Sequence, residues 1–331
     1  MDGVADIEER FVDVEERFVD VGDVRLQVAV REPDGGADGG TGGGTGGDRL
    51  ALCLHGFPES WYSWRHQIPL LARLGYRVWA PNLRGYGESD RPRGYRAYSI
   101  ENLMGDIAGL IDAAGARETV LLAHDWGAII AWYFAMRRVR PLHRLVILNV
   151  PHPGPARRAL RRSRQLLKSW YMFFFQLPWL PERLLEPGRL ARMMAETSVD
   201  PSRFGPEVQA VYARGAATVE ARRAMLDYYR ALLRGGGARR QAALGYPEIE
   251  TPTLMIWGEQ DVALTLETTR GTERWVRDLT LRRLPAASHW VQQDAPEVVN
   301  ALIEAWLAGG PVPEVSDLDV PAPQPGRSSA V

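Results

Sequence analysis

The stretch Thr119-Val120-Leu121-Leu122-Ala123-His124-Asp125-Trp126-Gly127 decides the fold of this chain. Its first five residues are apolar strand formers, and the apolar run 127–136 that follows indicates a buried helix. A residue between a buried strand and a buried helix, with small residues beside it, lies on a sharp turn. Such a turn lifts the Asp125 side chain above the carboxyl edge of a parallel sheet, where it is available as a nucleophile.

A carboxylate at this turn restricts the chemistry. Asp125 is already ionised at neutral pH, so it attacks without the help of a base. Its targets are strained or activated sp3 carbons, and the product of the attack is an alkyl ester of the enzyme. An esterase or lipase is disfavoured, because these enzymes carry serine at the corresponding position.

The remainder of the chain alternates strand and helix patterns, which predicts a mostly parallel sheet covered by helices on both faces. Strands are expected at 50–54, 77–80, 119–123, 145–149, 253–257 and 279–284. Helices are expected at 61–74, 100–114, 127–138, 267–276 and 296–308. Before them, an alternating run at 24–30 that follows a Gly-Asp turn predicts a first hairpin.

Two parts of the chain, residues 15–150 and 247–308, are therefore predicted to form one α/β core. The stretch 151–246 between them has helical patterns and lacks strand patterns, so it is interpreted as an inserted helical cap domain. In open α/β sheets ligands bind at the carboxyl edge, which is where such a cap is expected to lie.

Three further segments are expected to lie outside the packed core. Residues 8–14 recur at once as residues 15–21, so residues 1–14 are interpreted as a duplicated extension with no assigned role. Residues 35–47 are nearly all Gly, Thr and Asp, which predicts a flexible loop. The tail 309–331 is rich in Pro, Ser and Gly and is expected to be disordered.

Composition excludes several classes of partner. The chain has 331 residues and a net charge of -1, which gives no reason to expect nucleic acid or an anionic membrane. No run is long and apolar enough to span a bilayer. Cys53 is the single cysteine, so an intrachain disulfide is excluded and the cytoplasm is the expected compartment. The sequence leaves the oligomeric state open, a homodimer included.

Two more residues complete a catalytic set with Asp125. Asp261 lies just past a predicted strand, and His289 follows the last one. The chain order nucleophile, acid, histidine is the one that this layout of sheet and helices uses. His289, oriented by Asp261, is expected to take the proton from the water that hydrolyses the ester. A competing acid position after strand 145–149 holds Asn149, which carries no charge, so Asp261 is preferred.

An oxyanion hole is predicted from the segment His55-Gly56-Phe57-Pro58, directly after a strand. The backbone N–H groups of Phe57 and Trp126 are expected to hold the negative charge that develops during ester hydrolysis. His55, His124 and His152 are interpreted as structural or pocket-lining, because none has the spacing of metal ligands. The sequence thus predicts no metal and no cofactor.

From about Arg17 to Leu307, the chain resembles the soluble epoxide hydrolases of the α/β-hydrolase fold. The segment 55–65 matches that family's oxyanion segment closely, and Ser288-His289-Trp290, followed by Gln293 and Asp294, resembles its histidine segment. The resemblance implies an α/β-hydrolase fold with a cap. It also implies that an epoxide is converted to a vicinal diol through a covalent ester on Asp125.

The same resemblance implies two cap tyrosines that bind and protonate the epoxide oxygen. Phe175-Gln176-Leu177-Pro178 matches a family motif that places Tyr171 in the first role. A Tyr-Arg pair late in the cap places Tyr229 in the second, in preference to Tyr228. A phenol, with a pKa of about 10, stays protonated until the alkoxide forms. Trp126, Phe57 and Phe173 are expected to line the apolar substrate pocket.

Two other functions fit part of this pattern. A haloalkane dehalogenase shares the aspartate nucleophile, the histidine and the tryptophan at position 126, but it needs N–H donors for the halide. The Phe57 side chain offers none, and a cap tryptophan, Trp170 or Trp179, would have to substitute. A non-catalytic ligand-binding protein has no need to keep Asp125, Asp261 and His289 together.

Overall fold

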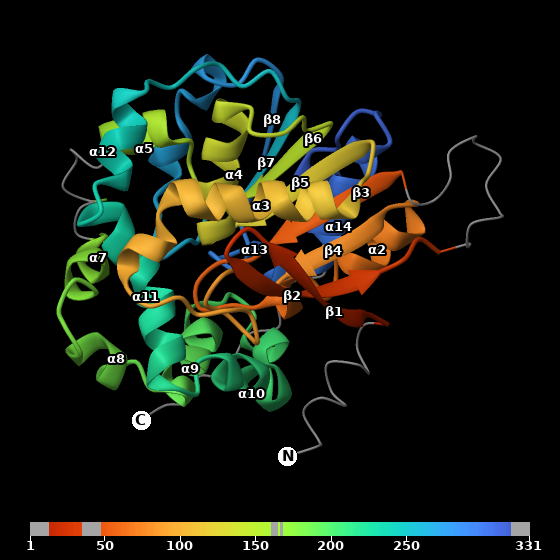
Figure 1. Ribbon diagram of the computed structural model, residues 1–331. Coiled ribbons are helices and arrows are strands. Elements are labelled where there is room, and N and C mark those ends of the chain that lie inside the picture. Colours follow the sequence, from red (N-terminus) through yellow and green to blue (C-terminus); the bar gives the residue numbers. More distant parts are fainter. Residues whose placement is uncertain (1–12, 35–47, 160–164, 166–167, 319–331) are drawn as a thin grey trace.

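The computed structural model describes residues 13–34, 48–159, 165 and 168–318 (Figure 1). The predicted loop 35–47, most of the duplicated extension and the end of the predicted tail therefore lie outside the described residues. No helix in the described part of the chain has both the length and the apolar character needed to cross a membrane.

A single eight-stranded sheet forms the centre of the molecule, and its strands follow the order β1-β2-β4-β3-β5-β6-β7-β8. The strands are β1 (Glu15–Val21), β2 (Val24–Arg31), β3 (Arg49–Leu54), β4 (Arg77–Pro81), β5 (Glu118–His124), β6 (Arg144–Leu148), β7 (Thr253–Gly258) and β8 (Leu279–Leu284). β1 and β2 form the antiparallel hairpin that the Gly-Asp turn predicts, and β2 also pairs antiparallel with β4. All pairs from β4 through β8 are parallel, which confirms the predicted α/β sheet.

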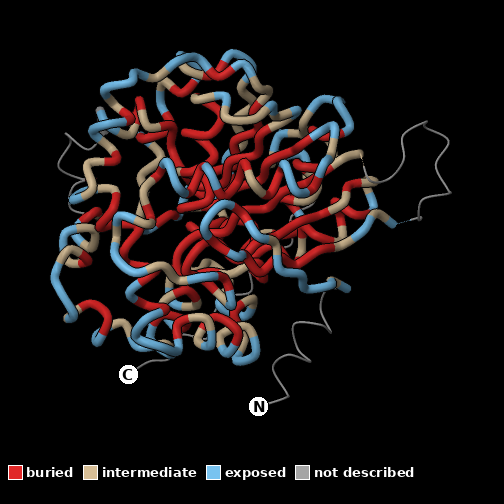
Figure 2. Tube along the Cα trace, in the orientation of Figure 1, coloured by how far each residue is buried: buried red, intermediate tan, exposed pale blue. Residues whose placement is uncertain are grey.

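Helices cover both faces of this sheet (Figure 1). Along β3, Leu50, Leu52 and Leu54 pack into one core, and Ala51 and Cys53 pack into the other, because side chains alternate along a strand. The first core is completed by α3 (Ile100–Ala114) and α4 (Asp125–Arg137), and the second by α2 (Ile68–Arg73) and α14 (Pro296–Leu307). The buried residues accordingly run in a continuous band through the sheet (Figure 2).

The chain between β6 and β7 holds the cap helices, which lie beyond the carboxyl ends of the parallel strands (Figure 1). The described ones are α5 (Pro153–Ala159), α7 (Trp170–Phe174), α8 (Leu180–Leu184), α9 (Pro187–Thr197), α10 (Pro206–Gly215), α11 (Val219–Leu233) and α12 (Gly237–Ala243). A short 3-10 helix, η3 (Pro201–Phe204), joins α9 to α10. After β8, α13 (Val291–Asp294) leads into α14.

Two of the predicted helices are wrong in detail. The stretch 61–74 is not one helix: a 3-10 turn, η1 (Trp61–Trp64), precedes α2, which begins next to Pro69 because proline suits a first helical turn. The stretch 267–276 forms only two 3-10 turns, η4 (Leu266–Thr269) and η5 (Thr272–Arg274), separated by Gly271 with φ of 87°. By contrast α3 begins and ends as predicted, capped by Ser99 and closed by Gly115 in the left-handed region.

The first part of the predicted disordered tail is ordered. Residues 309–318 lie against the core, where Val312, Val315 and Leu318 pack beside buried apolar residues. The Arg282 guanidinium on β8 donates to the Pro313 carbonyl at 2.7 Å and to that of Val312, and η6 (Val315–Asp317) follows. The prediction of disorder is wrong for these residues, because it rested on composition alone. A few apolar residues and one arginine are enough to hold a short proline-rich segment against the core.

Replacing Gly127 by alanine tests the packing beneath the turn from β5 to α4. A Cβ at position 127 would lie 2.4 Å from the backbone oxygen of Leu54, so β3 or α4 would have to shift. We expect Gly127→Ala to lower the free energy of unfolding by about 3 kcal/mol, the upper end of the range for overpacking. Chemical denaturation monitored by circular dichroism measures the change.

Gly105 provides the matched control for this substitution. It is a glycine on the exposed side of α3, and a Cβ there would meet no atom within 4 Å. We expect Gly105→Ala to raise the free energy of unfolding by about 0.5–1 kcal/mol, the usual gain of alanine over glycine in a helix. Equal stability of the two variants would contradict the packing argument.

Candidate active site

Asp125 is held in a strained backbone conformation at the junction of β5 and α4. Its φ of 46° lies in the left-handed region, which residues with a Cβ rarely adopt. Gly56 packs directly against it, and a Cβ at that position would lie 2.2 Å from the Asp125 Cβ. The sharp turn predicted from the sequence is therefore present. The carboxylate lies at the N-terminus of α4, where the helix dipole favours negative charge.

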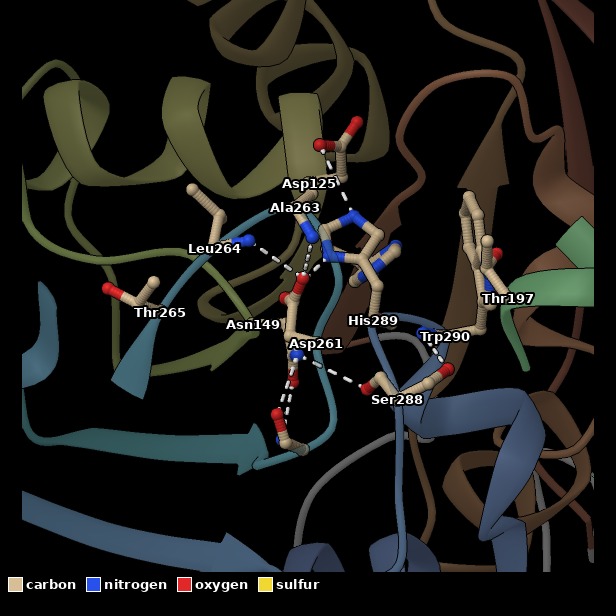
Figure 3. A network of polar contacts seen from close by, with 12 residues as sticks. Asp125, Asn149, Thr197, Asp261, Ala263, Leu264, Thr265, Ser288, His289 and Trp290 are labelled. Carbon is tan, nitrogen blue, oxygen red and sulfur yellow. Dashed lines mark hydrogen bonds and ion pairs between the residues drawn. The ribbon is translucent and has the colours of Figure 1, made fainter. Parts of the chain in front are cut away.

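The structure brings Asp125, His289 and Asp261 together from three separate segments of the chain (Figure 3). Asp261 follows β7, and His289 follows β8. His289 Nδ1 lies 2.7 Å from Asp261 Oδ2, and His289 Nε2 lies 3.5 Å from Asp125 Oδ2. The imidazole is therefore placed between the two carboxylates, with one ring nitrogen directed at each.

Asp261 is held by donors that the sequence interpretation did not assign. The backbone N–H groups of Ala263 and Leu264 donate to its Oδ1 at 2.7 and 2.8 Å. The Asn149 side-chain amide donates to its Oδ2 at 2.8 Å (Figure 3). The sequence treated Asn149 only as an uncharged rival of Asp261. Asn149 directly follows β6 and Asp261 follows the neighbouring parallel strand β7. Because the carboxyl ends of neighbouring parallel strands lie side by side, this placement could have predicted that the two side chains meet.

The charges of this site stabilise one another despite their burial. Burial alone would raise the pKa of Asp125, yet His289 and the Phe57 N–H hold it below its usual value. Burial likewise opposes ionisation of Asp261, and His289 again lowers its pKa. For His289, burial would lower the pKa, but the two carboxylates hold it well above 6.5. Both aspartates are thus ionised at neutral pH, as a nucleophile and an orienting acid require.

The predicted oxyanion donors lie at this turn. The Phe57 backbone N–H donates to Asp125 Oδ1 at 2.7 Å. Trp126 follows Asp125 in the first turn of α4, where backbone N–H groups have no acceptor within the helix. The Phe57 donor thus already binds the carboxyl oxygen that would carry negative charge during hydrolysis of an Asp125 ester.

Asp125 lies on the wall of an apolar cavity of about 440 Å³. Trp126, Tyr171 and Tyr229 line the same cavity, as does Arg157. The rings of Tyr171 and Tyr229 are 6.0 Å apart, edge to face. Burial and the nearby Asp125 charge raise the pKa of both phenols above the usual value, so both stay protonated at neutral pH.

One arginine joins the two segments that carry these tyrosines. Arg230 on α11 donates to the carbonyls of Phe175 and Leu177, just after α7, at 3.0 and 2.8 Å. Tyr171 and Tyr229 therefore face the cavity from two helices that are tied together. The neighbouring Tyr228 does not line it: its hydroxyl is buried and donates to the Arg84 carbonyl at 2.7 Å.

Two of the three predicted pocket-lining residues do not lie on the cavity wall. Phe173 is 61% exposed on the outer side of α7, because its neighbour Tyr171 takes the inward face of that short helix. The Phe57 ring packs behind Tyr229, with the ring centroids 5.6 Å apart. Trp126 alone of the three lines the cavity.

The cap also holds the loop that carries Asp261. Gln165 donates through its amide to the Ala263 carbonyl at 3.1 Å and accepts from the Thr265 N–H at 3.0 Å. Lys168 Nζ donates to the Asp261 carbonyl at 2.8 Å. The sequence interpretation assigned no role to either residue, since no local pattern connects them to a loop almost a hundred positions away. Within the described residues, no three His, Cys, Asp or Glu side chains are grouped as metal ligands would be.

Comparison with known proteins identifies the family. The family model of the alpha/beta hydrolase fold matches residues 52–296. The chain belongs to the alpha/beta hydrolase family. Its relatives include the AB hydrolase superfamily protein YfhM of Bacillus subtilis (strain 168), 38% identical over 270 residues, or 78% of this chain and 90% of YfhM. Epoxide hydrolase 4 of Homo sapiens is 36% identical over 267 residues, or 78% of this chain and 72% of that protein.

Solved structures of epoxide hydrolases share the fold. The epoxide hydrolase of Bacillus megaterium in complex with an inhibitor superposes with a TM-score of 0.76 and 29% identity, covering 88% of this chain and 100% of that one. Epoxide Hydrolase A of Mycobacterium thermoresistibile superposes with a TM-score of 0.75 and 28% sequence identity. The match covers 91% of this chain and 100% of that one. These likenesses confirm the predicted α/β-hydrolase fold and the resemblance to epoxide hydrolases.

The raised pKa of His289 makes the stability of this hydrolase depend on pH. A histidine whose pKa is higher in the folded state contributes its full stabilisation below its unfolded pKa of about 6.5, and this is lost as pH rises through the folded value. We expect the melting temperatures of the wild type and His289→Gln to differ most below about pH 6.5 and to approach one another as the pH rises above that value.

Thermal denaturation followed across this pH range tests the expectation. The exposed His143 supplies the control, and His143→Gln should track the wild type at every pH. A gap between the wild type and His289→Gln that stays constant with pH would show that the folded protein does not raise the pKa of His289.

Proposed function

We propose that this alpha/beta hydrolase is an epoxide hydrolase that uses Asp125 as its nucleophile and forms a vicinal diol. The observation that carries the proposal is the placement of two protonated phenols, Tyr171 and Tyr229, in the same apolar cavity as the Asp125 carboxylate. A strained ether needs a nucleophile on carbon and an acid on oxygen. The epoxide hydrolases among the relatives support the same function.

In the first step the Asp125 carboxylate attacks one epoxide carbon, and the carbon–oxygen bond to the ring oxygen breaks. The oxygen leaves as an alkoxide held by the hydroxyl groups of Tyr171 and Tyr229, one of which gives it a proton. The product is a hydroxyalkyl ester of Asp125. His289 is not required for this step, because Asp125 is already ionised.

In the second step water attacks the Asp125 ester carbonyl, and His289 takes a proton from that water. The bond between the Asp125 carboxyl carbon and the alkyl oxygen then breaks, and this oxygen leaves with the proton from His289 as the second hydroxyl of the diol. The Asp125 carboxyl group gives up the remaining proton, which restores the tyrosine that protonated the ring oxygen.

The negative charge of the second step develops on the carboxyl oxygen that faces the Phe57 N–H. Ester formation also removes the charge of Asp125, one of the two carboxylates that raise the pKa of His289. His289 therefore becomes easier to deprotonate at the stage when it must act as a base.

The proposal extends to the setting of the enzyme. We propose a small-molecule epoxide as substrate, a cytoplasmic location, and no requirement for a metal or cofactor. The buried Cys53 fits a reducing compartment, because burial raises its pKa and keeps the thiol protonated. A homodimer is compatible with this chemistry, and size-exclusion chromatography with light scattering tests for it.

Trapping the ester tests the order of the two steps. We expect His289→Gln to form the Asp125 ester with an excess of styrene oxide but to hydrolyse it slowly, because only the second step uses the imidazole as a base. Intact-mass spectrometry should show an adduct of one epoxide, and peptide mapping should locate it on Asp125. An active wild type whose His289→Gln variant forms no adduct would contradict the covalent route.

Halide release from 1-bromoalkanes and 1-chloroalkanes, measured beside diol formation, separates the proposal from a dehalogenase. We expect diol and no halide. The two cap tryptophans that might have donated to a halide, Trp170 and Trp179, are 64% and 60% exposed and do not line the cavity. Halide without diol would overturn the proposal, and binding without turnover would favour a ligand-binding protein.

The roles of the two phenols are tested by single substitutions. We expect Tyr171→Phe and Tyr229→Phe each to lower kcat/KM for the epoxide by about 10²-fold, the scale of general acid catalysis. The double variant should lose measurable ester formation, since the alkoxide then has no proton donor. Rapid-quench measurement of ester formation gives these rates directly.

Tyr228→Phe is the matched control, because it removes the hydroxyl of the adjacent tyrosine. That hydroxyl serves the Arg84 carbonyl, so we expect a loss of about 1–3 kcal/mol in stability and little change in rate. An equal loss of rate in all three variants would contradict the assignment of Tyr171 and Tyr229.

A further inference from the structure

The residue that follows His289 is bonded to the cap. Trp290 is buried, and its indole Nε1 donates to the hydroxyl of Thr197, the last residue of α9, at 2.9 Å (Figure 3). Chemistry fixes the direction of this bond, because an indole N–H can only donate and the Thr197 hydroxyl gives its own hydrogen to the Met193 carbonyl at 2.7 Å. The Trp290 and His289 rings meet edge to face, with their centroids 5.0 Å apart. A cap residue therefore holds the side chain that packs against the catalytic imidazole.

The residue that precedes His289 is bonded to the same part of the cap. The Ser288 N–H and hydroxyl both donate to Asp294 Oδ2, at 2.8 and 2.5 Å. The other oxygen of this buried carboxyl group bonds to the hydroxyl of Ser198, which directly follows α9. Because a backbone N–H can only donate, Oδ2 is an acceptor, and the link holds whether or not the other oxygen carries a proton.

Two further contacts strengthen this connection. Phe204 in η3 packs against Trp290, with the ring centroids 6.5 Å apart. The Ser198 hydroxyl accepts from the Asp200 N–H at 3.0 Å, which fixes the oxygen that faces the Asp294 carboxyl group. Trp290, Ser198 and Thr197 do not line the cavity. Their contacts therefore serve the loop of the catalytic histidine rather than the substrate.

The nucleophile is held in a different way from the base. Asp125 is fixed by the loop after β3, through close packing of Gly56 and the Phe57 N–H. The base has contacts with the cap on both of its segments, since Lys168 bonds to the Asp261 loop and the Thr197-Ser198 segment bonds to the His289 loop. The core therefore places the nucleophile, whereas the cap contributes to the placement of the base.

We propose that the Thr197-Ser198 segment positions the catalytic base, so that the cap places His289 relative to the covalent ester. Thr197 acts through Trp290, whose ring contacts the imidazole. Ser198 acts through Asp294, which holds the backbone of the residue before His289. Because both act through another residue, they are positioning residues rather than catalytic ones.

The segment is expected to matter for one half of the reaction. Ester hydrolysis needs the His289 imidazole beside both the water and the ester, whereas ester formation uses the Asp125 carboxylate and the two cap phenols. A loosened His289 loop should therefore slow hydrolysis more than formation. This kinetic consequence rests on the proposed epoxide hydrolase function, but the position of the imidazole in the free protein does not.

Rapid-quench kinetics on Thr197→Val and Ser198→Ala tests the positioning role. We expect each variant to slow ester hydrolysis on the order of tenfold while ester formation with styrene oxide changes little, so that the covalent intermediate accumulates. Thr197→Ser keeps an acceptor for the indole and should hydrolyse the ester at close to the wild-type rate. Glu196→Gln, which changes the exposed neighbouring side chain on α9, is the control.

Two outcomes of this experiment would overturn the positioning role. One is equal slowing of both steps, or of neither, in Thr197→Val and Ser198→Ala. The other is a Thr197→Ser variant that hydrolyses the ester as slowly as Thr197→Val. If Thr197→Val does not fold, Ser198→Ala decides, because it removes the second link and leaves the Trp290 contact in place.

The position of the imidazole is tested without substrate, by NMR on the protein with 15N-labelled histidine. We expect the ring signals of His289, assigned by their loss in His289→Gln, to shift in Thr197→Val and to stay in place in Thr197→Ser and Glu196→Gln. Unchanged His289 signals in Thr197→Val would overturn the proposal, whether or not any epoxide is turned over. A wild type that forms no ester on Asp125 would contradict the proposed function alone, and the NMR result would still decide how His289 is positioned.

Discussion

The left-handed turn at Asp125 is the constraint on which the site depends. A φ of 46° is costly for a residue with a Cβ, and the surrounding contacts have to maintain it. Gly56 and Gly127 allow β3 to approach so closely that the Phe57 N–H reaches the carboxylate. Because the turn fixes where the nucleophile lies, it also fixes where the base, the oxyanion donor and the cap tyrosines have to be.

Charge balance is the second constraint, and it accounts for the number of donors around the site. Asp125 and Asp261 are brought into one apolar region, where isolated carboxylates would be expensive. His289 lies between them, and Asn149 and two backbone N–H groups serve the remaining oxygens of Asp261. The cap stabilises the position of the same loop, since Lys168 and Gln165 donate to the backbone carbonyls of Asp261 and Ala263.

The sequence predicted those parts of the molecule in which local pattern and chemistry coincide. Strand–helix alternation gave the parallel sheet, and the chain order of Asp125, Asp261 and His289 gave three side chains that do meet. Contacts between distant segments were not predictable. Asn149 and Lys168 reach Asp261 only because the fold brings three distant segments of the chain together. Phe173 failed as a pocket residue because a five-residue helix has one inward face, which Tyr171 occupies.

Buried histidines show most directly why residue type alone does not define a role. His55, His124 and His152 all lie in the core, and the sequence grouped them as structural or pocket-lining. Their surroundings separate them: His55 faces one donor and one acceptor, His152 faces a donor, and His124 faces two acceptors. A buried imidazole takes the protonation state that its neighbours can satisfy. The same ring can therefore be a packing element or a link between the loop after β3 and the backbone of the catalytic histidine, and only the three-dimensional arrangement of donors and acceptors decides which.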